Sequence, residues 1–187
     1  MIHSRPVRAK VTKVNSMSEE QMMDAAQAMG GGDFQAAMAI FDELREANPD
    51  MAEAHYGWAE AAFMRLSIDM EDDVPAALIM RAYKQAMSLD EENLGYVSSF
   101  ANFCLDCGRI PMAIKEYQRL EKMADLQEIP VEDTLFEASR LVVEAIERID
   151  PERANPMVEP WLRQSLLWAV GGLGYSAESA IETLSNE

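Results

Sequence analysis

The chain has 187 residues, of which 49% are apolar and 26% are charged. A chain of this length and composition can form one domain with a sizeable core, and its composition excludes an intrinsically disordered protein. No apolar run reaches the roughly 18 residues of a membrane-spanning helix, and the first fifteen residues contain no apolar segment of a signal peptide. We therefore expect a soluble, cytoplasmic protein without membrane insertion, and two cysteines without an export signal argue against a disulfide scaffold.

The formal net charge is −17, from 33 acidic and 16 basic residues. Residues 1–15 contain no acidic residue but four basic ones, Arg5, Arg8, Lys10 and Lys13. The rest of the chain therefore has a net charge even more negative than −17. Such a body repels phosphate backbones, and we expect no binding of nucleic acid. The first segment also alternates apolar and polar residues with the period of a strand. We expect residues 1–16 to form a basic arm, which is either flexible or extended along its own groove or a partner.

Helix-like runs follow one another in pairs from residue 17 to residue 125. Between Gly31 and Asp50, apolar side chains recur every three or four residues, which places them on one face of a helix. Asp33 can cap the start of this helix, and Asn48–Pro49 ends it. Similar runs return at 75–90 and 108–124, and each of the three is preceded by another run, at 17–29, 52–66 and 94–107.

The small and aromatic residues of these pairs resemble those of the tetratricopeptide repeat (TPR), which recurs at about 34 residues. The resemblance covers roughly residues 18–125, with units that start at Ser18, Ala52 and Leu94. The matching residues are Ala25, Gly32, Ala37, Phe41 and Pro49 in the first unit, Ala59, Tyr83 and Ala86 in the second, and Ala101, Gly108, Ala113 and Tyr117 in the third.

The second and third units also depart from the TPR pattern. The second has Leu66 in place of the turn glycine and about eight additional residues, 67–74, between its helices. This insertion carries acidic side chains that we interpret either as a solvated helix start or as a contact loop for a basic partner. The third unit has Asp125 in place of the usual proline.

The resemblance implies an all-α fold, a right-handed α-α superhelix of TPR-like solenoid type, with three helix pairs over residues 17–125. We expect residues 126–187 to form atypical C-terminal packing helices that cap the stack. They contain an amphipathic run at 132–149, an apolar run at 157–170, a glycine-rich break, and a short last run at 177–185. The apolar width of this segment alternatively indicates a docking surface.

In TPR arrays the first helices of successive units line a concave surface, and the resemblance implies which positions face it. The implied peptide-binding groove is apolar, rich in Met and acidic, and it contains neither Lys nor Arg. It therefore differs from TPR proteins that hold the C-terminal carboxylate of heat-shock chaperones through a cluster of basic residues. We expect it to bind another protein through an apolar or basic peptide segment, unless the tail helices bury it. The groove residues are Met22, Met29, Glu53, Tyr56, Glu60, Phe63, Met64, Ser98, Asn102, Leu105 and Asp106.

Two short motifs permit other chemistry. Cys104 and Cys107 form a C-x2-C pair, but a zinc site needs four ligands, and the only histidines are His3 and His55. We interpret the pair as structural, with a redox or metal site as the alternative. The residues 172–177, GLGYSA, match a dinucleotide-loop pattern by letter but lack the strand that such a loop follows.

No arrangement of side chains indicates catalysis, so we predict a protein that is not an enzyme and has no cofactor. The sequence favours a protein–protein interaction module, either an adaptor or an assembly factor, and leaves homo-oligomerisation open. One alternative is a small acidic TPR chaperone similar to those of type III secretion. The other is an accessory subunit of a redox or metal enzyme complex.

Overall fold

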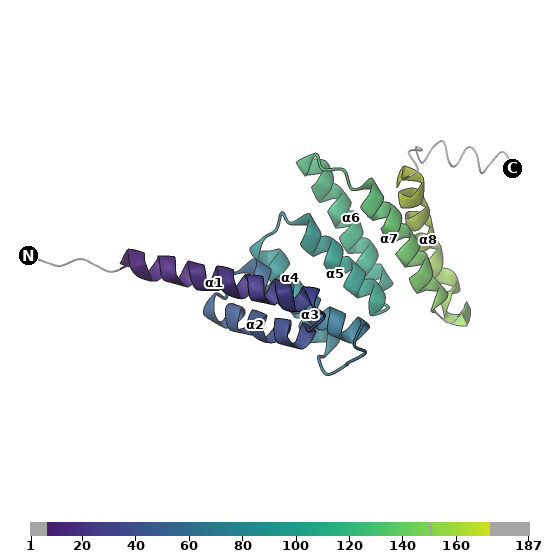
Figure 1. The fold of residues 1–187 in the computed structure, drawn as a ribbon. Coiled ribbons are helices and arrows are strands. Elements are labelled where there is room, and N and C mark those ends of the chain that lie inside the picture. Colours follow the sequence, from purple (N-terminus) through teal and green to yellow (C-terminus); the bar gives the residue numbers. More distant parts are fainter. Residues whose placement is uncertain (1–6, 150, 173–187) are drawn as a thin grey trace, which may run out of the picture. The chain divides into compact units, whose positions relative to one another are not determined.

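The computed structural model of the chain describes residues 7–149 and 151–172, and this part of the chain consists of helices and their connections (Figure 1). The predicted all-α fold is confirmed for these residues, which contain no strand. In chain order the helices are α1 (Val7–Gly30), α2 (Phe34–Ala47), α3 (Ala52–Ser67), α4 (Ala76–Leu89), α5 (Leu94–Asp106), α6 (Ile110–Gln127), α7 (Glu132–Glu147) and α8 (Pro151–Gly172).

The chain divides into two compact units, which we call unit 1 (Met1–Glu91) and unit 2 (Glu92–Glu187). In unit 1, α2 packs against α1 and α3, and α3 packs against α4. In unit 2, each helix packs against the next one, and α5 and α6 also contact α7 and α8, respectively. Each unit therefore consists of neighbouring helices packed in sequence, as expected of an all-α, solenoid-like fold.

Small residues allow the helices of each pair to approach closely. Ala25, Ala59 and Ala101 have the same position in the three predicted units, and each is fully buried. Ala37 and Ala113 in the second helices are likewise inaccessible to solvent. These five alanines are among the small residues on which the predicted pairing depended, so their burial explains why the sequence spacing indicated helix pairs.

Two of the interhelical turns have the same backbone geometry. Gly32 and Gly108 adopt φ angles of 77° and 68°, in the left-handed region where a side chain is disfavoured. After each glycine, the next amide donates a hydrogen bond back to the preceding helix, from Asp33 to the Ala28 carbonyl at 2.9 Å and from Arg109 to the Cys104 carbonyl at 2.7 Å. The turn glycines of the first and third predicted pairs are therefore required by the backbone.

The N-terminal segment differs from expectation. Residues 7–16 belong to α1, whereas their alternating pattern favoured an extended or flexible arm. Six alternating positions, residues 7–12, are too few to exclude a helix, and this segment contains neither Gly nor Pro after Pro6. Its basic residues are good helix formers, so the first predicted helix extends towards the N-terminus as far as Val7.

The C-terminal helices agree with expectation where the structure describes them. The predicted run at 132–149 forms α7, and the run at 157–170 lies within α8. The predicted helix at 177–185 and most of the GLGYSA motif lie outside the described residues. Among the described helices, none combines the length and the apolar character that a membrane crossing requires.

A close contact between α2 and α3 gives a test of this packing. Gly57 of α3 is buried, and a Cβ atom at this position would overlap the ring carbons of Phe41 in α2. We expect Gly57→Ala to lower the free energy of unfolding by about 1–3 kcal/mol, because the ring must shift. Urea unfolding followed by circular dichroism measures this change.

Gly30 of α1 provides the matched control, because a Cβ atom there would meet no atom within 4 Å. Gly30→Ala should leave the free energy of unfolding unchanged or slightly higher, since alanine favours a helix over glycine. Equal effects of the two substitutions would contradict the packing of Phe41 over Gly57.

Candidate functional site

The predicted groove residues divide between the two units. In unit 1, Met22 and Met29 lie on α1, and Glu53, Tyr56, Glu60, Phe63 and Met64 lie on α3. In unit 2, Ser98, Asn102, Leu105 and Asp106 lie on α5. Leu105 is only 5% exposed and belongs to the core of unit 2, so it is not part of the candidate site. The other ten side chains are exposed or half-buried and can meet a ligand.

A tyrosine hydrogen bond recurs in two helix pairs. In α3–α4 the Tyr83 hydroxyl donates to Glu60 Oε1 at 2.6 Å, and in α5–α6 the Tyr117 hydroxyl donates to Asn102 Oδ1. Both tyrosines are buried, whereas both acceptors are half-buried on the first helix of the pair. These two predicted groove positions are therefore fixed by a bond to the core.

The first helix pair lacks this bond. The corresponding residues are Ala26 on α1 and Phe41 on α2, neither of which has a polar side chain. In α3 the neighbouring Tyr56 packs edge-on against Tyr83, with 6.2 Å between ring centroids. Tyr56 and Glu60 are thus brought together around Tyr83 in unit 1.

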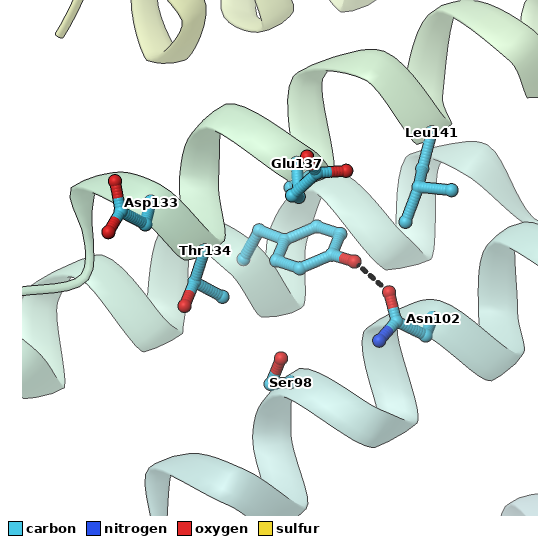
Figure 2. A pocket seen from close by; sticks show the side chains of 8 residues that line it. Ser98, Asn102, Asp133, Thr134, Glu137 and Leu141 are labelled. Carbon is cyan, nitrogen blue, oxygen red and sulfur yellow. Dashed lines mark hydrogen bonds between the residues drawn. The ribbon is translucent and has the colours of Figure 1, made fainter. Parts of the chain in front are cut away.

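In unit 2 a cavity of about 350 Å³ lies between α5, α6 and α7. Figure 2 shows residues of α7 along one side of it and Ser98 and Asn102 of α5 on the other. Two predicted groove residues therefore line a common cavity. The complete lining is Ser98, Asn102, Tyr117, Asp133, Thr134, Glu137, Ala138 and Leu141.

The sequence did not predict the contribution of α7 to this cavity. Asp133, Glu137 and Leu141 are spaced four residues apart and therefore share one face of α7. This spacing is visible in the sequence, but the TPR resemblance assigned the groove to first helices within residues 18–125.

The cavity presents hydrogen-bond acceptors and negative charge. Asp133 and Glu137 are exposed, and the lining contains no Lys or Arg. Glu137 accepts a hydrogen bond at 3.1 Å from Arg140 Nε, but both side chains are more than half exposed, so water screens this pair. Ala138, Leu141 and the Tyr117 ring supply apolar surface. This lining suits a cationic side chain with an apolar stem.

Tyr117 forms a rigid wall of the cavity. Burial, with a smaller contribution from Cys104, raises the pKa of the Tyr117 hydroxyl far above its usual value, so it remains a neutral donor. Its ring packs edge-on against Trp168 of α8 at 5.7 Å between centroids. The Trp168 indole donates in turn to Glu121 Oε2 at 3.4 Å. The tyrosine is thus held on both sides and is unsuited to proton transfer at neutral pH.

The cysteine pair lies at the end of α5 in unit 2. Cys104 is buried and Cys107 is half-buried, and neither forms a disulfide within the described residues. Burial and the charge of Asp106 raise the pKa of the Cys107 thiol, while Arg109 partly opposes this effect. Reactive cysteines have a lowered pKa instead. No group of three His, Cys, Asp or Glu side chains that could hold a metal occurs within the described residues.

The acidic insertion between α3 and α4 is partly anchored. Arg65 donates from Nε to Asp73 Oδ1 at 3.0 Å and from Nη2 to Oδ2 at 2.6 Å. This pair lowers the pKa of the Asp73 carboxyl, chiefly through the hydrogen bonds. Arg65 also donates from Nη1 to Gln35 Oε1 on α2 at 3.2 Å. Asp73 therefore fixes the loop to the helices, while Asp69 and Asp72 remain exposed.

Compared with models of known protein families and with curated proteins, the chain matches none.

Tyr117 gives this site a measurable pH dependence. In the unfolded chain the hydroxyl ionises near pH 10, whereas the folded chain retains the proton at higher pH. Its contribution to stability is therefore present below pH 10 and declines as the pH rises above that value. At pH 8 we expect Tyr117→Phe to lower the free energy of unfolding by about 0.5–1.5 kcal/mol, because one hydrogen bond is lost.

Between pH 10 and pH 11 this difference between the wild-type chain and the Phe variant should shrink. Urea unfolding of both proteins at a series of pH values measures it. A difference that stays constant across the series would contradict a buried, neutral Tyr117.

Proposed function

We propose that the chain is a non-enzymatic protein-interaction module, an adaptor or assembly factor, that binds a basic or apolar peptide segment of a partner. The observation that carries this proposal is the cavity in unit 2. Its carboxylates, Asp133 and Glu137, stand beside the apolar side chains of Ala138 and Leu141. Such a surface complements the side chain of lysine or arginine along its whole length.

Partial burial of the ligand determines how strongly these carboxylates bind it. An exposed ion pair contributes only about 0–1 kcal/mol, because water and salt screen it. A charge-assisted hydrogen bond contributes about 1.5–3 kcal/mol. Because Asp133 and Glu137 are themselves exposed, this contribution requires that the bound ligand shield them from water. The hydroxyl of Ser98 and the amide of Asn102 can hold the same cationic group by further polar contacts. Several such contacts give a basic side chain a clear preference over a neutral one.

The repeated helix pairs support the resemblance to a TPR array. Equivalent turn glycines, Gly32 and Gly108, adopt the same conformation, and equivalent tyrosines, Tyr83 and Tyr117, form the same bond. Helices packed in this way form the binding surface before the ligand arrives. A preformed surface loses little conformational entropy on binding, which favours recognition of a short segment.

For unit 1 we propose a related surface on α3. Tyr56, Phe63 and Met64 are half-buried and offer apolar area, and Glu53 and Glu60 add negative charge. Methionine adapts its shape to irregular partners, and aromatic side chains contribute strongly to binding energy. This surface therefore suits a segment that combines apolar and basic residues.

A pair of amidated peptides tests the charge preference of unit 2. One is an acetylated nonapeptide of alternating leucine and lysine, and the other has glutamine at every lysine position. We expect Asp133→Asn with Glu137→Gln to weaken binding of the lysine peptide about tenfold or more, since charge-assisted bonds are lost. Fluorescence anisotropy of labelled peptides measures the affinity.

The matched control is Asp125→Asn with Glu147→Gln, which removes the same charge from exposed positions of unit 2 outside the cavity. This control should bind the lysine peptide as the wild-type chain does. Equal weakening by both double variants would show that overall charge, and not the cavity, attracts the peptide.

The apolar part of the proposal has a separate test on α3. We expect Phe63→Ala to weaken binding of the leucine–glutamine peptide severalfold, because a half-buried ring supplies much of the contact area. Met23→Ala is the control, since Met23 is 73% exposed on α1 and is not one of the predicted groove residues. Unchanged affinity of the Phe63 variant in anisotropy measurements would remove α3 from the site.

A further inference from the structure

A second cavity, of about 450 Å³, lies in unit 1. It is formed by the end of α2, the connection to α3, the first half of α3, and α4. It shares no residue with the predicted groove, and it falls within the size range of small-ligand sites. Its lining is Arg45, Pro49, His55, Trp58, Leu78, Arg81, Ala82 and Gln85.

The charge of this cavity is opposite to that of the chain. Its lining contains two arginines and no Asp or Glu, although the chain as a whole has a net charge of −17. Arginine stays charged at all physiological pH values. Surface arginines keep a protein solvated wherever they lie on it. Two arginines in the lining of one cavity of an acidic chain therefore suggest a role in binding an anion.

Arg45 is held in place by two contacts. Its guanidinium lies over the ring of Trp58, 4.3 Å from the centroid. Asp42 pairs with Arg45 and also accepts a hydrogen bond at 3.1 Å from Trp58 Nε1. The Arg45 Nε atom is buried and has no acceptor among the described residues. Arg45 and Trp58 therefore form a preorganised wall of the cavity.

Arg81 supplies the uncompensated charge. It is exposed on α4 and forms no ion pair with any residue in the described part of the chain. Within the lining, His55 Nε2 lies 2.8 Å from the Pro49 carbonyl oxygen and donates to it, since a carbonyl can only accept. This bond fixes the α2–α3 connection beside the cavity. Leu78 and Ala82 add apolar surface from α4.

We infer that this cavity binds a carboxylate group of a partner peptide, with Arg81 as the main ligand contact and Trp58 and Leu78 packing on the adjoining apolar atoms. A guanidinium offers paired donors that match the two oxygens of a carboxylate. The strongly acidic body disfavours long polyanions, which would pass beyond the cavity. The carboxylate comes either from an Asp or Glu side chain or from a chain terminus. This inference is independent of the function proposed for unit 2, because different helices carry it.

Three short peptides and the full ¹⁵N-labelled chain test the inference. The first, acetyl-Ala-Leu-Glu-Ala-amide, carries a side-chain carboxylate, and the second, acetyl-Ala-Leu-Ala, has a free C-terminal carboxylate. The third, acetyl-Ala-Leu-Gln-Ala-amide, is neutral. We expect one or both acidic peptides to shift the Trp58 indole NMR signal saturably, and the neutral peptide to leave it in place. The peptide that binds identifies the source of the carboxylate.

Substitutions on α4 test whether Arg81 contacts the peptide carboxylate. Arg81→Gln should weaken the acidic peptide about tenfold, because a charge-assisted hydrogen bond is lost. Lys84→Gln removes the same charge from α4 outside the cavity and should leave binding unchanged. Circular dichroism checks that the exposed Arg81 substitution preserves the fold. The Asp133→Asn, Glu137→Gln protein should bind the acidic peptides normally, which separates this site from the cavity of unit 2.

Three results would overturn the inference. The first is an absence of shifts at Trp58 with both acidic peptides. The second is equal binding of the glutamine peptide, which would show that the carboxylate is not recognised. The third is wild-type affinity in the Arg81→Gln variant.

Discussion

A buried tyrosine hydroxyl must find an acceptor, and this requirement connects the core of each unit to its surface. Tyr83 and Tyr117 lie in second helices and donate to Glu60 and Asn102 on the first helices. The acceptors must therefore be polar although they border apolar neighbours. The same bond limits the movement of side chains that a ligand would meet. In unit 2 the constraint reaches further, because Tyr117 also packs against Trp168 of α8.

The sequence predicted the helices and the all-α fold because their signals are local. Small residues, turn glycines and apolar stripes lie within one helix or one turn, so spacing alone reveals them. Each cavity is lined by three consecutive helices, and spacing within one helix carries no record of how the three pack together. In the sequence, Arg45 and Arg81 are indistinguishable from other surface charges. Only the packing of α2 and α4 against α3 shows that both line one cavity. Leu105 shows the reverse error, since its repeat position indicated a groove but it is buried within unit 2.

Charge is distributed unevenly between the two cavities. The lining in unit 2 has two carboxylates and no cation, whereas the lining in unit 1 has two arginines and no carboxylate. The net charge of −17 therefore describes the chain as a whole but does not indicate the charge of either cavity lining. A partner with both basic and acidic positions would find a complementary cavity for each kind, one in each unit.

The connection between α3 and α4 has a further consequence. Arg65 ties Asp73 to α3, and the backbone between them carries Met70, which is 80% exposed and has a φ of 58°. A loop that is tethered near its end while its tip faces solvent can change in length without disturbing the helices it joins. This connection is thus the place where a reporter domain or an epitope could be spliced into the chain.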